Sequence, residues 1–430
     1  MRFEKEQIKA IAGDLFEGDN IKKNTKYQWV DIVGIPPRPE NLKKSLYFTT
    51  HSNGEDGWDN GFDRRTIAPR VSQDKGWDLV VEAGDTTPHE NSLIVSSLDS
   101  LALKLLESVK LETNPYVIGV TGSVGKTTTV AFLEHLIAGA GIDVKRFYSK
   151  RLTPLGVTCH YINRVDKDTS VVVMEYSAYL KDHVDTLSQL LPPNLAFLTN
   201  VYNTHLNPGS FSDRNEIFHS KIQIGQPRTT GYVNERILNE LNEPQPAGWN
   251  NFRVEKCPFE NKSLPPTLRT DEMYTVGKIV AENLGLSETH LKNAFETFLP
   301  QEKRIINTTF AGKKIFFNGE TSGGSRLWSW FETTNVSPPW LFVDEVNFAD
   351  ENPLGFINLL KHVFDSEKTL VLDTPANRSR LPVKAHFVNA NRFKTMLKQA
   401  PKGYIVYHKA LSTRDPAFVP KTYLRDHWGP

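Results

Sequence analysis

The sequence predicts an α/β protein of three domains, on the basis of three observations. The chain has 430 residues, and a typical domain has about 100 to 200. Hydrophobic residues make up 39% and charged residues 23%, a composition that can form several buried cores. Short apolar runs alternate with segments whose apolar residues recur at helical spacing, which is typical of α/β folds.

The composition argues against several classes of function. Lys and Arg total 51 against 50 Asp and Glu, so no basic surplus favours nucleic acid as a partner. No uncharged apolar run reaches the roughly 18 residues of a membrane helix, and residues 1–13 lack a signal-peptide core. We therefore expect a cytoplasmic location without membrane insertion. Cys159 and Cys257 are too few for a disulfide framework or a thiolate metal site.

Residues 1–110 are expected to form a small α/β domain at the N-terminus. Strand-like runs alternate there with loops rich in Gly, Asn and Asp, and the segment ends in a helix with apolar residues near helical spacing. These apolar residues are Leu101, Leu103, Leu105, Leu106 and Val109.

Residues 111–303 are expected to form a central domain with a parallel sheet. The apolar strand Tyr116–Val120 is followed by the glycine-rich turn Thr121–Gly125 and a helix. Two further buried strands, Ser170–Met174 and Leu195–Thr199, end where polar residues begin, as parallel strands do at their carboxyl ends.

Residues 304–430 are expected to form a third, Rossmann-like domain of modest size. Five apolar runs, separated by helix-like segments such as Leu354–Phe364, repeat the alternating pattern. Residues 411–430 are expected to be an irregular tail. The five runs are Lys314–Phe317, Trp340–Val343, Thr369–Asp373, His386–Val388 and Tyr404–Tyr407.

The segment Gly119-Val-Thr-Gly-Ser-Val-Gly-Lys-Thr127 contains what a triphosphate site needs. Its small residues let backbone N–H groups approach phosphate oxygens, and the following helix offers its positive end. Lys126 can reach the β and γ phosphates, and the Thr127 hydroxyl can bind Mg²⁺. The strict G-x-x-x-x-G-K-[ST] pattern is not matched, because Val120 stands where the first glycine is expected. The predicted nucleotide-binding residues are Gly122, Ser123, Val124, Gly125, Lys126, Thr127 and Thr128.

Three further residues have both a functional and a structural interpretation. Glu175 ends a buried strand, where it can bind Mg²⁺ through carboxylate oxygen or form an ordinary salt bridge. His205, taken alone, is typical of a structural histidine. Lys221, taken alone, is typical of a solvated helical lysine.

Several motifs resemble those of the Mur ligase family, which forms amide bonds in peptidoglycan precursors. Thr121-Gly-Ser-Val-Gly-Lys-Thr-Thr-Thr129 resembles its T-G-[ST]-x-G-K-T-[ST] signature. Val173-Met-Glu-Tyr-Ser177 and Asn200-Val-Tyr-Asn-Thr-His205-Leu are similar to its V-x-E-x-[GS] and N-x-x-x-x-H-L motifs. His219-Ser-Lys221-Ile-Gln-Ile is similar to a helix whose lysine is carbamoylated in many members.

The N-terminal segments are similar to the MurF branch of this family. They are Ser45–Phe48, Asp56–Phe62 and Trp77–Glu82. The resemblance implies an ATP-dependent ligase that joins a small-molecule carboxylate, possibly UDP-linked, to an amine through an acyl phosphate.

The resemblance also implies roles for single residues. Glu175 and His205 would bind Mg²⁺, and a carbamate on Lys221 would bind a second Mg²⁺. These three residues and Lys126 would be catalytic. Asp271 matches the position of an adenine-contacting Asn in the family.

Arg304 matches an arginine that related enzymes place near the nucleotide phosphates. An interdomain salt bridge is the alternative for this residue.

The third domain diverges from the MurF pattern. Asn318-Gly-Glu-Thr-Ser-Gly323 lacks the aspartate of the D-S-Y-N-A-N stretch, and Lys409-Ala-Leu-Ser412 keeps only part of a K-G-S-R loop. This divergence favours a MurF-like paralogue that uses a different acid over the MurF of peptidoglycan synthesis. A phosphoryl-transfer or regulatory NTPase and a degenerate, non-catalytic partner subunit are further alternatives. The acid, the amine and the oligomeric state stay open at this point.

Overall fold

The structure is a computed structural model whose described residues divide into two compact units. The first unit comprises Met1–Val120, Gly141–Ala196 and Gln223–Thr230, and the second comprises Thr121–Ala140, Phe197–Ile222 and Gly231–Pro430. The described residues are 3–32, 45–49, 78–85, 91–147, 153–202, 210–261, 264, 269–299, 305–319, 340–347, 368–381, 385–401, 404–410 and 418–429.

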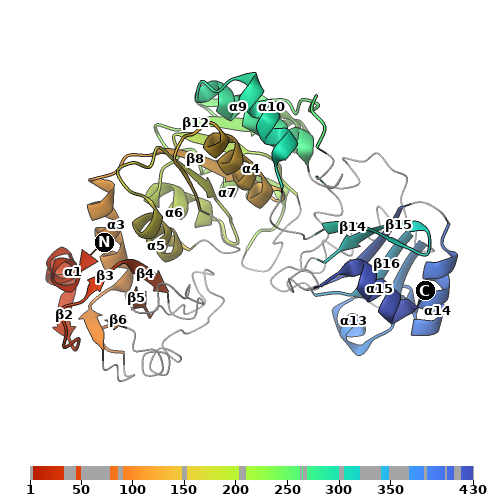
Figure 1. Cartoon of the computed structure of the whole chain (residues 1–430), viewed down its shortest axis with the longest axis horizontal. Coiled ribbons are helices and arrows are strands. Elements are labelled where there is room, and N and C mark those ends of the chain that lie inside the picture. The colour runs from red at the N-terminus through yellow and green to blue at the C-terminus, as the bar shows by residue number, and fades with distance from the viewer. Residues whose placement is uncertain are drawn as a thin grey trace. The chain divides into compact units, whose positions relative to one another are not determined.

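The N-terminal part, coloured red to orange in Figure 1, contains a five-stranded sheet. The order of its strands is β2-β7-β6-β5-β4. The pairs β4/β5, β5/β6 and β6/β7 are parallel, and the edge strand β2 pairs antiparallel with β7. Strands β1 and β3 form a separate two-stranded antiparallel sheet. The elements are β1 (Phe3–Glu4), α1 (Lys5–Ala12), η1 (Gly13–Leu15), β2 (Phe16–Asp19), β3 (Lys26–Tyr27), β4 (Trp29–Ile32), β5 (Ser45–Phe48), β6 (Asp78–Glu82), β7 (Ser92–Val95) and α3 (Leu98–Lys110).

Helix α3 confirms the amphipathic helix predicted at the end of this part. Ser97 caps its N-terminus by accepting a hydrogen bond from the Ser100 N–H group. Leu101, Leu105, Leu106 and Val109 are buried, as the spacing predicts. Leu103 is 44% exposed, because it lies off the face that the other four share.

A second sheet has six strands in the order β13-β12-β11-β8-β10-β9. The strand pairs β8/β10, β9/β10 and β12/β13 are parallel, as predicted. Its elements are β8 (Tyr116–Thr121), α4 (Lys126–Gly139), β9 (Val144–Phe147), α5 (Pro154–Arg164), β10 (Val171–Glu175), α6 (His183–Leu190), β11 (Leu195–Leu198), α7 (Arg214–Ile222), β12 (Thr230–Asn234), α8 (Glu235–Leu241), β13 (Trp249–Phe252), α9 (Thr270–Asn283) and α10 (Glu288–Thr297).

The third sheet also has six strands, in the order β14-β15-β19-β16-β17-β18. Strand β14 is antiparallel to β15, and the other pairs are parallel, so the predicted Rossmann-like pattern is confirmed. The predicted helical segment Leu354–Phe364 lies outside the described residues. The elements are β14 (Ile305–Phe310), β15 (Lys313–Asn318), β16 (Trp340–Glu345), β17 (Thr369–Leu372), α13 (Pro375–Arg380), β18 (Phe387–Val388), α14 (Ala390–Gln399), β19 (Tyr404–Lys409) and α15 (Pro420–Trp428).

The prediction of an irregular C-terminal tail is wrong for its described residues. Helix α15 begins at Pro420, a residue that favours the first turn of a helix because it lacks a backbone N–H group. Leu424 and Trp428, four residues apart, are buried in the core of the third sheet with Phe393 and Tyr407. This packing stabilises the helix, although its mostly polar sequence gives little indication that a helix forms.

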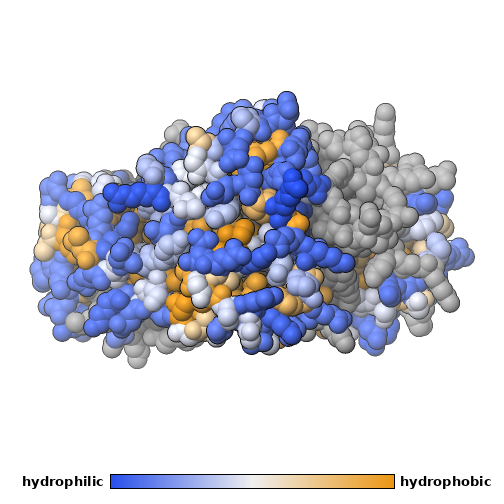
Figure 2. Space-filling view, turned by 90° about the horizontal axis from the view of Figure 1, so that it is seen from above, coloured by the Kyte–Doolittle hydropathy of each residue, from blue (hydrophilic) through white to orange (hydrophobic). Residues whose placement is uncertain are grey.

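The surface is largely polar where it is described. Figure 2 shows hydrophilic residues over most of the described atoms on one face, with hydrophobic residues gathered in smaller groups. Among the described residues, five large apolar side chains are exposed: Leu103, Leu111, Val254, Leu299 and Val419. Within the described part of the chain, no helix combines the length and the apolar character needed to cross a membrane.

Candidate active site

The phosphate loop connects β8 to α4 and contains two glycines that its geometry requires. Gly125 directly precedes α4 with a φ of 83°, a left-handed conformation that residues with a Cβ rarely adopt. A Cβ on Gly122 would lie 2.5 Å from Oγ1 of Thr199, the residue after β11. The backbone of the loop can therefore approach both α4 and the end of β11 closely.

Lys126 is the first residue of α4, and its Nζ atom folds over the loop. It donates to the carbonyl oxygens of Gly122 at 2.8 Å and Ser123 at 3.3 Å. A positive charge at a helix N-terminus, where backbone N–H groups point outward, favours the binding of anions. Lys126 and α4 thus supply the charge and the donors that a nucleotide phosphate requires.

Asn200, two residues after β11, holds the loop through its side-chain amide. Its Oδ1 atom accepts from the N–H groups of Ser123 at 3.0 Å and Val124 at 2.9 Å, and its Nδ2 atom donates to the Val124 carbonyl at 2.9 Å. Ser123 is also bound through its hydroxyl, which accepts from the Tyr202 N–H group at 2.9 Å. The loop is therefore fixed at two points by the segment after β11.

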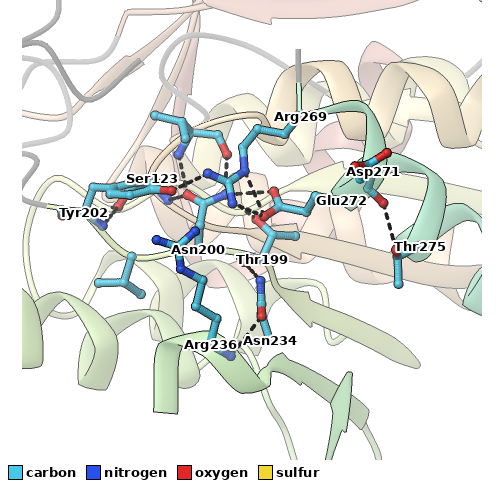
Figure 3. A network of polar contacts seen from close by, with 12 residues as sticks. Ser123, Thr199, Asn200, Tyr202, Asn234, Arg236, Arg269, Asp271, Glu272 and Thr275 are labelled. Atoms are coloured by element: carbon cyan, nitrogen blue, oxygen red, sulfur yellow. Dashed lines mark hydrogen bonds and ion pairs between the residues drawn. The ribbon is translucent and has the colours of Figure 1, made fainter. Parts of the chain in front are cut away.

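A buried ion pair lies behind Asn200 at the start of α9 (Figure 3). Glu272 is 2% exposed and accepts from Nε of Arg269 at 3.0 Å and from Nδ2 of Asn200 at 2.9 Å. Arg269 also donates to the Tyr202 hydroxyl, and its guanidinium lies over the Tyr202 ring. Burial raises the pKa of the Glu272 carboxyl, while Arg269 and Asn200 oppose this rise by stabilising the carboxylate.

Glu175 is the last residue of β10 and is buried. It lies opposite Val120 in the parallel register of β8 and β10, one residue before the loop begins at Thr121. Its Oε1 atom accepts from the Ser177 hydroxyl at 3.0 Å. A carboxylate is thus present at the carboxyl end of a strand, where parallel sheets bind ligands.

Lys221 lies in the last turn of α7 and is 2% exposed. The interpretation of Lys221 as a solvated helical lysine is therefore wrong, because the side chain is buried.

The comparisons with known proteins agree with this local geometry. Residues 120–318 match a family model described as the Mur ligase middle domain. This part of the chain is thus similar to the Mur ligase middle domain. A UDP-N-acetylmuramoylalanine--D-glutamate ligase from Thermosipho africanus is 28% identical over 55% of this chain and 54% of its own length. A UDP-N-acetylmuramoyl-tripeptide--D-alanyl-D-alanine ligase from Bacillus subtilis is 31% identical over 34% of this chain and 31% of its own length.

The likeness of the fold extends beyond the Mur ligase domain. A crystal structure of MurF from Acinetobacter baumannii has a TM-score of 0.68 to this chain at 13% identity, covering 99% of this chain and 98% of the other. The chain therefore has the three-domain α/β fold of MurF. In sequence, the chain spans about a third to about half of the length of the two curated relatives.

The structure places some of the predicted site residues of the Mur ligase domain together. The loop residues from Gly122 to Thr128 form one continuous turn and the first turn of α4. His205 and Arg304 lie outside the described residues, so their roles stay predictions. Where side chains are described, no group of three or more His, Cys, Asp or Glu residues is arranged to hold a metal ion.

Asp271 lies apart from the loop, although it is adjacent to Glu272 in sequence. Its Oδ1 atom accepts from the Cys257 N–H group at 3.0 Å, and Figure 3 shows it near Thr275, away from Asn200. Sequence reasoning missed Asn200, Arg269 and Glu272 as contributors to the site. Asn200 had a signal, since it is the first residue of the N-x-x-x-x-H-L motif.

Proposed function

We propose that this protein is an ATP-dependent ligase that joins a carboxylate to an amine. The observation that carries the proposal is the phosphate loop with Lys126, which lies between β8 and α4 in a segment that matches the Mur ligase middle domain. Both curated relatives named above are ligases that build UDP-linked muramoyl peptides, which supports a substrate of this class. A cytoplasmic location fits such substrates.

The chemistry needs activation of the carboxylate, because oxide is a very poor leaving group. A carboxylate oxygen attacks the γ phosphorus of ATP, the bond to the bridging oxygen breaks, and ADP leaves. The amine nitrogen then attacks the carbonyl carbon of the acyl phosphate, phosphate leaves with the electrons of the C–O bond, and the nitrogen loses a proton. Phosphoryl transfer of this kind depends mainly on positioning and on neutralising charge.

The residues of the chain have distinct roles in this scheme. Lys126 holds the β and γ phosphates, and the N-terminus of α4 stabilises their negative charge. One Mg²⁺ would be held by Thr127, Glu175 and His205 and a second by a carbamate on Lys221, and both would neutralise charge on the phosphates. The buried carboxylate of Glu175 and the hydroxyl of Thr127 fit a hard cation, which prefers oxygen ligands.

The third domain favours a paralogue over the MurF of peptidoglycan synthesis. Asn318, at the end of β15, contacts the buried His408 at 3.2 Å. Lys409, at the end of β19, pairs with Glu345 at 2.9 Å. Asn318 stands where the MurF motif has an aspartate, whereas Lys409 keeps the lysine of the K-G-S-R loop. The lost aspartate supports a different acid or amine.

The ligase proposal is tested by measuring phosphate release from ATP in the presence of Mg²⁺ and mixtures of acids and amines. We expect release that requires both a carboxylic acid and an amine, with UDP-linked muramoyl peptides among the acids. Lys126→Ala should abolish this release without unfolding the protein, because its side chain serves the ligand and is not part of a core. Hydrolysis at the same rate without any amine would instead favour a phosphoryl-transfer NTPase.

The paralogue proposal has its own test. UDP-linked tripeptide with D-Ala-D-Ala should give little product, because the third-domain motifs differ from those of MurF. A kcat/KM of about 10⁴ M⁻¹s⁻¹ or more for this pair, as is typical of enzymes on their own substrates, would contradict it.

A further inference from the structure

The ion pair of Arg269 and Glu272 is unusual because both side chains are nearly inaccessible. Their side chains are 10% and 2% exposed, and NH2 of Arg269 lies 2.9 Å from Oε2 of Glu272. A buried ion pair often contributes little net stability, since desolvation of two charges offsets their attraction. A role other than stability is therefore worth seeking.

Glu272 is one of three acceptors for Nδ2 of Asn200, beside the Val124 carbonyl and Oγ1 of Thr199, and it reinforces the orientation of the amide. An ionised carboxylate only accepts hydrogen bonds, so it requires the Nδ2 atom, 2.9 Å away, to face it. With Nδ2 turned to Glu272, Oδ1 faces the loop, where it accepts from Ser123 and Val124. A rotated amide would place an N–H donor against these two N–H donors, and the loop would lose both bonds.

Arg269 keeps the Glu272 carboxyl ionised and holds it in position next to Asn200. Its guanidinium binds one carboxylate oxygen and leaves the other, Oε1, for Asn200. The Tyr202 hydroxyl and ring hold the guanidinium from the other side. The pair also adjoins the last loop glycine, since a Cβ on Gly125 would lie 3.8 Å from Oε1 of Glu272.

We propose that Arg269 and Glu272 are positioning residues of the phosphate loop, acting through the amide of Asn200. The pair holds Ser123 and Val124 in place in the absence of a nucleotide. The phosphates themselves would be bound by Lys126 and the N-terminus of α4. This inference rests on the proposed nucleotide site, which it deepens by assigning how the loop is preformed.

Amide hydrogen exchange of the nucleotide-free protein tests the proposal directly. Glu272→Gln has nearly the same shape but can present a donor as well as an acceptor to Asn200, so its hold on the amide weakens and exchange in the peptide that covers residues 121–126 should rise by about tenfold. The affinity for MgADP, measured by calorimetry, should fall by a similar factor. Arg269→Lys, which keeps the positive charge, should have a smaller effect on both.

A double variant separates positioning from stability. Removing both charges in Arg269→Met/Glu272→Met should restore the melting temperature that the single variants lose, because no unpaired charge stays buried. Loop exchange should stay fast and MgADP binding weak. Lys278→Gln is the matched control, because Lys278 lies on α9 like Glu272 but forms an exposed ion pair, with Glu255 before the helix. This variant should change neither readout.

Two outcomes would count against these ideas in different ways. A double variant with the loop exchange and MgADP affinity of the wild type would overturn the positioning proposal. A wild-type protein that does not bind MgADP would overturn the proposed function, while the exchange measurement would still decide whether the pair holds the loop.

Discussion

Lys221 illustrates how burial changes the interpretation of a single side chain. It lies in α7 at 2% exposure, where an ammonium group has lost most of its hydration. A carbamate on its nitrogen would carry negative charge that Mg²⁺ can neutralise. The burial is consistent with the proposed carbamate, since a screened site protects it from water.

We predict that Lys221→Ala lowers kcat by roughly 100-fold or more, the range seen when one charge-stabilising group is lost. Acetate should restore part of the activity, because it fits the vacated space and returns an anionic oxygen. Steady-state rates with and without acetate measure this effect. Lys292→Ala, at an exposed position on α10, should show neither the loss nor the rescue. Near-normal activity of Lys221→Ala would contradict the carbamate.

The residues of the phosphate loop could be predicted because they are contiguous in sequence. One strand, one turn and one helix carry the whole motif, so local pattern suffices. Arg269 and Glu272 could not be predicted, since their contacts with Asn200 and Tyr202 depend on how α9 packs. The adjacent Asp271 matches the family pattern in sequence, and its side chain accepts from the Cys257 N–H group. Its contact with adenine stays a prediction.

The pairing of α4 with α9 depends on a glycine at their closest approach. A Cβ on Gly277 of α9 would lie 2.5 Å from Cε1 of Phe132 in α4. Phe132 is fully buried and packs against Phe295 and Phe298, so its ring has little room to move. We predict that Gly277→Ala lowers the free energy of unfolding by roughly 1 to 2 kcal/mol, because overpacking outweighs the gain in helix propensity.

Gly139, at the end of α4, provides the control for this prediction. A Cβ there would meet nothing within 4 Å, so Gly139→Ala should leave stability unchanged or raise it by up to about 1 kcal/mol. Urea unfolding of both variants measures the difference. Equal stabilities of the two variants would show that α4 and α9 can separate at no cost.

Strand β19 contains a buried histidine that should make the third domain sensitive to acid. Burial lowers the pKa of His408 from 6.5 to about 4. Its Nδ1 atom faces Nδ2 of Asn318, which can only donate, so the folded state requires an unprotonated Nδ1. Below about pH 6.5, His408 takes up a proton in the unfolded chain but not in the folded chain. The contribution of His408 to the free energy of unfolding is therefore fully present above that pH. This contribution is lost as the pH falls from about 6.5 to about 4.

The expected loss between pH 7 and pH 5 is about 2 kcal/mol from His408 alone. Amide exchange of β15 and β19 at the two pH values measures the stability of this sheet. His408→Asn removes the titrating group, so its stability should change less between these pH values than that of the wild type. The same pH dependence in both proteins would assign the effect to other groups.

Several buried strands could be predicted from the sequence, whereas α15 could not. Strands of parallel sheets are nearly continuous apolar runs, and β8, β10 and β11 follow that rule. Helix α15 has few apolar residues, and its stability comes from the burial of Leu424 and Trp428 in a core formed by distant strands. Tertiary packing of this kind leaves only a weak local signal.

The three-domain organisation could be predicted because each main sheet is drawn from one continuous part of the sequence. The strands of the three sheets come from residues 16–95, 116–252 and 305–409, which fall inside the three predicted ranges. The exact boundaries at 110 and 303 stay predictions. The Mur ligase match continues to residue 318 and so includes β14 and β15, which pair in the third sheet.

The contacts of Asn200 have a consequence for the order of folding events. Its bonds to the loop span 76 and 77 residues of chain, and its bond to Glu272 spans another 72. Closing such long loops costs entropy before the contacts repay it, and contacts of high sequence separation form slowly. In refolding from urea, the ability to bind a fluorescent ADP analogue should therefore emerge with the slowest phase, well after helical circular dichroism recovers. Simultaneous recovery of both signals would mean that the nucleotide pocket is already assembled in the rate-limiting nucleus.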